Sequence, residues 1–119
     1  MSTYFPIFIG GGLGSLVRFY FSKNLTAATG FHWGTFSANL VSCFILGLLF
    51  SLRLRGDLSH QVQLLLITGF CGGFSTFSTF SLEVFQDLQE GRVVTALLYA
   101  AISMLSGLLA ILAGIRLLQ

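Results

Sequence analysis

The sequence predicts an all-α integral membrane protein: a single domain over residues 1–119 with four transmembrane helices, the third of which is broken. Hydrophobic residues make up 55% of the chain and charged residues only 8%, whereas soluble domains carry about 25% charged residues. The mean hydropathy is +0.88. Uncharged stretches at 1–17, 24–52, 58–82 and 93–115 approach or exceed the roughly 20 residues that a helix needs to cross a bilayer.

The first predicted span covers about residues 4–25, and it reaches across a bilayer only if it continues past Arg18. Gly10 and Gly14 are four residues apart, a spacing typical of close helix packing. Arg18 lies near the end of the span and either extends to the interface or adds positive potential to a vestibule that gathers anions. We expect no cleaved signal peptide, because a basic leader and an obvious cleavage site are both missing.

The second predicted span, about 33–54, carries polar side chains on one face. Thr35 and Asn39 are four residues apart, so they lie on the same side of a helix. An asparagine is costly in hydrocarbon, and we expect it to face the protein interior or a wet cavity. Asn39 therefore either makes an interhelical hydrogen bond or presents its amide N–H groups to an anion.

The third predicted span, about 61–88, contains the segment "GFCGGFSTFSTFS" at 69–81. Gly72 and Gly73 each weaken a helix by about 1 kcal/mol relative to alanine, and we expect them to permit a break. The serine and threonine hydroxyls that follow can bond backbone groups released by the break. A broken helix exposes carbonyl groups to a cation and N–H groups to an anion.

Phenylalanine recurs every third residue in this segment, at positions 74, 77 and 80. The ordinary explanation is aromatic packing, and the alternative is that the positive edges of the rings face an anion. Glu83 follows one turn after Thr79, either as an interfacial charge or as an acid at a pore mouth. In the fourth predicted span, about 93–116, Tyr99 and Ser103 either bond neighbouring helices or border a pathway.

The predicted loops are short, at 26–30, 55–57 and 90–92, so any function lies within the membrane. Positive charge is nearly equal on the two sides. One side carries Arg53, Arg55 and Arg116, and the other carries Lys23, Arg92 and, if it reaches the interface, Arg18. This balance leaves single and dual insertion equally open. Four helices barely shield a polar pathway from lipid, so we expect a dimer, and an antiparallel pair would imitate the inverted repeats of larger transporters.

Several function classes are disfavoured by what the sequence lacks. It has no nucleophile motif, no phosphate loop and no dinucleotide fingerprint, so we expect no enzyme. His32 and His60 look isolated near span ends, without metal-site spacing. Cys43 and Cys71 fall inside predicted spans, where we expect buried packing residues rather than a disulfide. The net charge of +2 is too small to indicate nucleic-acid binding.

Two functions remain. The first is a channel or transporter for a small ion, in which donors and aromatic edges replace the hydration shell. The second is a dimeric exporter of cationic compounds, similar to the small multidrug exporters. That exporter chemistry needs an acid in the first span, where this chain has Arg18. The residues therefore favour the first function.

Three motifs, in this order, resemble the CrcB/Fluc family of fluoride channels: "GGGLGSLVR" at 10–18, "GTFSAN" at 34–39 and "GFCGGFSTFSTFSLE" at 69–83. The third motif is highly specific, and the similarity covers essentially the whole chain. The resemblance implies a passive, fluoride-selective channel that exports fluoride across the bacterial inner membrane. It also implies an antiparallel, dual-topology homodimer in the lipid bilayer, with two pores and a central structural sodium ion.

The resemblance further implies roles for individual residues. The helix break would fall at 72–75, and the main-chain carbonyls of Gly72 and Ser75 from both subunits would hold the sodium ion. Residues implied to line the fluoride pore are Asn39, Phe77, Phe80, Ser78, Thr79, Tyr99 and Ser103. Arg18 would lie near the vestibule and Glu83 near a pore end. Ser37-Ala38 and Gly107 depart from the family pattern and bear on the conduction rate more than on the function.

Overall fold

The structure is a computed structural model that describes residues 2–25 and 30–119. Every regular element in these residues is helical, which confirms the predicted class. The elements are α1 (Tyr4–Leu25), α2 (Trp33–Leu54), α3 (His60–Gln63), the π-helix η1 (Leu64–Cys71), α4 (Gly72–Phe74), α5 (Phe77–Gln89) and α6 (Val93–Leu117). The predicted loop at 26–30 lies outside the described residues, except for Gly30.

The helices begin and end close to the predicted bounds, because composition sets where an apolar helix starts and stops. The predicted ranges 4–25 and 33–54 coincide with α1 and α2. The third predicted span, 61–88, corresponds to the run from α3 to α5, which is one residue longer at each end. The fourth, 93–116, continues one residue further, to Leu117.

Three stretches of the described chain are long and apolar enough to cross a membrane: Trp33–Leu54, His60–Gln89 and Val93–Leu117. The chain is therefore a multi-pass membrane protein. Helix α1 has 22 residues but is not among these stretches. Arg18, Lys23 and its glycines make α1 less apolar than the other three. That α1 crosses the bilayer remains a prediction.

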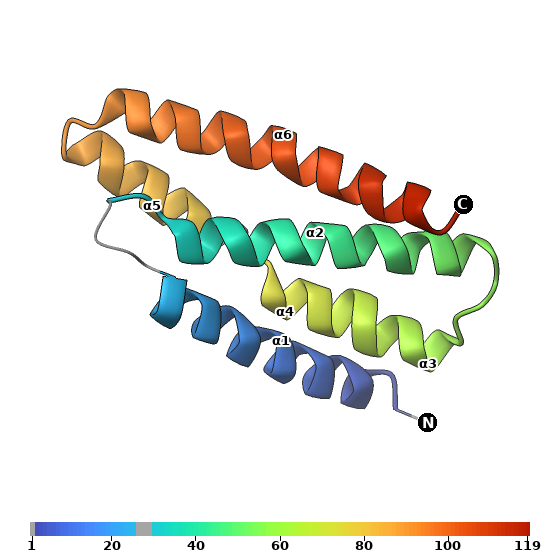
Figure 1. Cartoon of the computed structure of the whole chain (residues 1–119). Coiled ribbons are helices and arrows are strands. Elements are labelled where there is room, and N and C mark those ends of the chain that lie inside the picture. Colours follow the sequence, from blue (N-terminus) through green and yellow to red (C-terminus); the bar gives the residue numbers. More distant parts are fainter. Residues whose placement is uncertain (1, 26–29) are drawn as a thin grey trace.

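Helix α2 runs through the middle of the molecule, with α6 along one side and α1 and the α3–α4 run along the other (Figure 1). Helix α5 lies beside the first part of α6, at the end where α2 begins (Figure 1). Both chain termini and the turn between α2 and α3 lie at the opposite end (Figure 1). The third span thus packs on α1 before its break and on α6 after it.

Glycines bring α1 into backbone contact with the third span. A Cβ atom on Gly10 would lie 2.9 Å from the amide nitrogen of Phe70, and one on Gly14 would lie 2.8 Å from that of Phe74. From the other side, a Cβ on Gly69 would lie 2.9 Å from the carbonyl oxygen of Ile7. These contacts confirm that Gly10 and Gly14 serve close helix packing.

The exposed and buried side chains are distributed as expected for a protein surrounded by lipid. Large apolar side chains of α1 and α6 point outward, such as Phe8, Leu16, Leu105 and Leu109. The largest fully buried side chains are Tyr99, Phe74, Asp87 and Ser42, three of which carry polar groups. A polar group in a bilayer must find its hydrogen-bond partners within the protein, so these buried groups mark the candidate region for a functional site.

Candidate functional site

The third span is interrupted at Ser75 and Thr76, whose backbones are extended. Their torsion angles are φ −83°, ψ 157° and φ −152°, ψ 124°. The predicted position of the break, at 72–75, is wrong for its two glycines, because Gly72 and Gly73 both lie in α4 and Gly72 has φ −64° and ψ −35°. Gly73 instead contacts α1, where a Cβ would lie 3.1 Å from Gly11 Cα. Of the predicted break at 72–75, only Ser75 leaves the helix.

Hydroxyl groups of Ser75 and Thr76 bond the backbone on either side of the break. The Ser75 hydroxyl donates to the carbonyl oxygen of Cys71 at 2.7 Å. The Thr76 hydroxyl caps α5 by accepting from the amide of Thr79 at 3.2 Å, and it lies 3.4 Å from the hydroxyl of Ser78. The Cys71 carbonyl oxygen also keeps its helical donor, the Ser75 amide, at 3.0 Å, so Thr76 is the residue that confirms that hydroxyls in this segment bond released backbone groups.

Asn39 of α2 bonds both backbone groups of Thr76. Its Oδ1 accepts from the Thr76 amide at 2.8 Å, and its Nδ2 donates to the Thr76 carbonyl oxygen at 3.3 Å. A helix would have satisfied those two groups internally, so Asn39 stabilises the extended conformation. The structure thus shows the interhelical hydrogen bond that was one of the two alternatives for this residue.

Arg18 is directed toward the break rather than toward the end of α1. Its Nε donates to the carbonyl oxygen of Gly73 at 3.0 Å, and its side chain is half-buried. In an unbroken helix this carbonyl would accept from the amide of Phe77. Arg18 therefore replaces a helical donor, and a vestibule role remains a prediction.

Two further carbonyl groups lose their helical donors at the break. The Thr76 amide, which would bond Gly72 in an unbroken helix, donates to Asn39 instead. The Thr79 amide, which would bond Ser75, donates to the Thr76 hydroxyl. Within residues 2–25 and 30–119, the oxygens of Gly72 and Ser75 are thereby left for another partner. Carbonyl oxygens of unwound helices suit an alkali cation, so these two residues fit the predicted sodium ligands.

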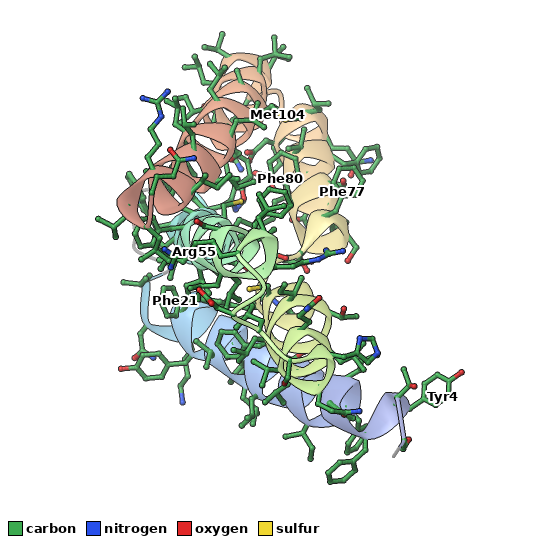
Figure 2. All side chains as sticks on the ribbon, turned by 90° about the vertical axis from the view of Figure 1, so that its right-hand side faces the viewer. Tyr4, Phe21, Arg55, Phe77, Phe80 and Met104 are labelled. Atoms are coloured by element: carbon green, nitrogen blue, oxygen red, sulfur yellow. The ribbon has the colours of Figure 1, made fainter. Side chains whose placement is uncertain are left out.

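An apolar groove of about 410 Å³ opens beside the break, between α5 and α6. It is lined by Asn39, Cys43, Ser75, Thr76, Phe77, Phe80, Ala100, Ser103, Met104, Gly107, Leu108 and Ile111. Figure 2 shows Phe77 and Phe80 on α5 beside the part of α6 that carries Met104. Their ring centroids are 6.3 Å apart, and the Phe77 side chain is 80% exposed in the single chain.

The phenylalanine triplet divides at the break. Phe74 is buried, and its ring packs edge-on against Phe21 with centroids 5.3 Å apart. Packing therefore accounts for Phe74, whereas Phe77 and Phe80 line the groove. The thiol groups of Cys43 and Cys71 are both free in the described chain, where Cys71 is buried and Cys43 is half-buried.

Glu83 is held by two hydroxyl groups from different helices. The Tyr99 hydroxyl donates to its Oε1 at 2.8 Å, and the Thr35 hydroxyl donates to its Oε2 at 2.9 Å. The Tyr99 ring also packs against Phe80, with centroids 5.0 Å apart and planes at 61°. Phe80 in the groove thus contacts Tyr99, which in turn donates to Glu83. Ser103 does not join Tyr99 in this network, and its buried hydroxyl has no hydrogen-bond partner in the described chain.

A cluster that the sequence did not reveal lies beyond Glu83, at the start of α2. The Nε2 atom of His32 lies 3.0 Å from Oδ2 of the fully buried Asp87. Arg92 donates to Oδ1 of Asp87 at 2.5 Å and also pairs with Glu90. The hydrogen bond to Asp87 raises the pKa of Arg92. His32 is therefore not isolated. The sequence feature that could have indicated this cluster is the four-residue spacing of Glu83 and Asp87, which places both carboxylates on one face of a helix.

Fold and site together define a small multi-pass membrane protein whose polar groups gather at a broken helix and an open groove. The chain belongs to the CrcB family: the family model described as "CrcB-like protein, Camphor Resistance (CrcB)" matches residues 5–115.

Similar proteins in three bacteria carry the name "Fluoride-specific ion channel FluC". The relative from Phocaeicola vulgatus is 37% identical over 97% of this chain and 97% of its own length. The relatives from Azobacteroides pseudotrichonymphae and Flavobacterium psychrophilum are 43% and 40% identical, over 96% and 97% of this chain and 94% and 95% of their own lengths. An ion channel is not an enzyme, so these comparisons bear out the expectation that this chain is not one. They also favour the channel over the exporter.

Proposed function

We propose that this protein is a passive, fluoride-selective channel that exports fluoride across the bacterial inner membrane. The observation that carries the proposal is the groove beside the break, in which hydrogen-bond donors and aromatic rings meet within apolar spans. Its relatives' name supports fluoride as the ion. Because fluoride is small and strongly hydrated, the groove must replace its hydration shell with closely spaced donors.

Two side chains lining the groove have donor capacity left for an anion. An amide nitrogen carries two N–H bonds, and Asn39 uses one of them on the Thr76 carbonyl oxygen. The Ser103 hydroxyl is without a partner in the described chain. Edges of the Phe77 and Phe80 rings add partial positive charge. The hydroxyls of Ser78, Thr79 and Tyr99 complete the proposed polar pathway.

The channel is proposed to work as an antiparallel homodimer with two pores. One chain alone leaves the polar groups of the break beside an open groove, where contact with lipid would be costly. A second copy covers the groove and the exposed Phe77 ring. The central sodium ion would be held by the free carbonyl oxygens of Gly72 and Ser75, two from each chain, and would link the subunits at the two breaks. Arg18 and Glu83 are proposed to lie near the vestibule and a pore end.

Purified protein in liposomes is expected to release fluoride and to retain chloride. Efflux is followed with an ion-selective electrode, and only the release that begins when a potassium ionophore is added is counted, because that release requires the movement of charge. Chloride is larger and fits a narrow track of donors poorly, so its efflux should remain at the level of protein-free vesicles. Equal efflux of both anions would contradict selectivity, and proton-coupled release of a cationic dye would support the exporter instead.

Both orientations of the chain are expected in the membrane. Asp57 and Glu90 lie in loops at opposite ends of the molecule, so Asp57→Cys and Glu90→Cys report opposite sides (Figure 1). A membrane-impermeant maleimide applied to intact cells should label a comparable share of each variant. The native thiols lie within the spans, and the unsubstituted protein serves as the background control. Labelling of one variant only would contradict the antiparallel dimer.

A further inference from the structure

We propose that His32 is a positioning residue for Glu83, and that its protonation makes fluoride conduction depend on pH. The inference deepens the proposed function and rests on it, because Glu83 is proposed to lie at a pore end. The observation behind it is a contact of one imidazole ring with two carboxylates. His32 lies 3.0 Å from Asp87 through Nε2 and 3.5 Å from Glu83 through Nδ1.

The ring of His32 is held in place from two sides. Its plane lies against the buried ring of Tyr99, with centroids 5.0 Å apart and planes at 36°. Asp87 is fixed in turn by Arg92 at 2.5 Å. Tyr99 also donates to Glu83, so the same residue fixes the positions of the imidazole ring and of the Glu83 carboxylate. His32 thus has little freedom to turn away when its charge changes.

Charged and polar groups from several elements surround His32. Helix α5 contributes Glu83 and Asp87, and α6 contributes the neutral hydroxyl of Tyr99. The loop between these helices contributes Arg92, which is shared by Asp87 and the exposed Glu90. The last turn of α1 carries Lys23, which makes no ion pair with this cluster in the described chain. The two carboxylates near the ring thus have one permanent positive charge beside them, that of Arg92, and a protonated His32 supplies a second positive charge.

The two protonation states of His32 act differently on Glu83. Protonated imidazole carries an N–H group on each nitrogen, so it hydrogen-bonds Asp87 and forms an ion pair with Glu83 at the same time. Neutral imidazole has one N–H bond, and the shorter Asp87 contact is the better position for it. The lone pair on Nδ1 then faces Oε2 of Glu83 and repels it. Loss of one proton from His32 therefore removes the positive partner of Glu83, which the Tyr99 and Thr35 hydroxyls still hold, and leaves an unbalanced negative charge at the proposed pore end.

This arrangement predicts faster fluoride efflux in acid than in base. Histidine is the side chain that ordinarily changes charge between about pH 5 and pH 8, so efflux is compared on either side of that range. With equal pH inside and outside, charge-moving efflux is expected to fall about fivefold from pH 6 to pH 8.5, the effect of about one unit charge close to the path. Subtraction of protein-free vesicles removes the leak of hydrogen fluoride in acid.

Two substitutions should separate positioning from a structural role. His32→Gln removes the titrating group and should hold efflux at the low, basic-pH level throughout. His32→Lys keeps a positive charge and should hold efflux at the high level throughout. The other histidine, His60 on α3, lies at the opposite end of the molecule, so His60→Gln should keep the pH profile of the unsubstituted protein (Figure 1).

The inference and the proposed function fail in distinguishable ways. Fluoride efflux at any single pH supports the channel, and a flat profile in the unsubstituted protein, or an unchanged profile in His32→Gln, would overturn the role of His32. If the protein conducts no fluoride, histidine-selective ¹⁵N NMR in detergent still tests the contact. The His32 signal, assigned by its loss in His32→Gln, should respond to Asp87→Asn, and the His60 signal should not. A His32 signal that ignores Asp87→Asn would also overturn the inference.

Discussion

Replacing Phe77 by isoleucine is expected to lower fluoride efflux about a hundredfold, equivalent to a barrier raised by about 2.7 kcal/mol. Phe77 lines the groove and is 80% exposed in the single chain, so its ring contributes little to the packing of that chain. Isoleucine retains the apolar surface but lacks the positive ring edge that an anion can approach. The variant should therefore fold and dimerise while conducting poorly.

Phe80→Ile should cause a similar loss of efflux, with an additional effect on stability. The Phe80 ring packs against Tyr99, and such aromatic pairs contribute about 0.5 to 1.5 kcal/mol beyond their buried area. Efflux from liposomes is compared at equal protein content, after size-exclusion chromatography has established that each variant is dimeric.

Phe8→Ile is the matched control for both ring variants. Phe8 is 76% exposed on α1 and does not line the groove, so the same chemical change there should leave efflux unaltered. Unchanged efflux in both Phe77→Ile and Phe80→Ile would remove the rings from the mechanism.

Replacing Gly14 by alanine is expected to destabilise the protein by about 1 to 3 kcal/mol, the usual cost of overpacking a core. The added methyl group would lie 2.8 Å from the amide nitrogen of Phe74 and closer still to the carbonyl oxygen of Phe70. Both are backbone atoms that cannot turn aside, so α1 and the third span must separate. The measurement is the temperature at which the detergent-solubilised dimer is lost from a size-exclusion profile.

Gly12 provides the control within the same helix. A Cβ atom on Gly12 would meet no atom outside its own stretch of helix backbone within 4 Å in the described chain, and alanine favours a helix by about 1 kcal/mol relative to glycine. Gly12→Ala should therefore melt at or above the temperature of the unsubstituted protein. If Gly14→Ala melts together with Gly12→Ala, the close contact between α1 and the third span does not hold the fold together.

The structure changes the interpretation of the segment at 69–81. Its glycines look like the cause of the break when helix propensity is considered alone. In the structure Gly69 and Gly73 belong to a packing surface against α1, and the break occurs after them. The hydroxyl of Thr76, the amide of Asn39 and the guanidinium of Arg18 satisfy the backbone groups that are freed where the chain leaves the helix.

The sequence by itself determines the membrane class, the helix bounds and the family. Class and bounds follow from local composition, since an apolar stretch of sufficient length must form a helix in lipid whatever surrounds it. This is why the predicted ranges 4–25 and 33–54 coincide with α1 and α2. The family follows from three short motifs, and the match over residues 5–115 agrees with them.

Only the tertiary structure decides where the third span breaks and which polar groups meet. Asn39 and Thr76 are 37 residues apart in the chain, and His32 and Asp87 are 55 apart, so no local pattern connects either pair. A glycine changes helix stability by only about 1 kcal/mol. A buried polar group left without a partner costs about 1 to 3 kcal/mol. Long-range hydrogen bonds therefore outweigh the local preference, because a membrane offers no water to satisfy the groups that they join.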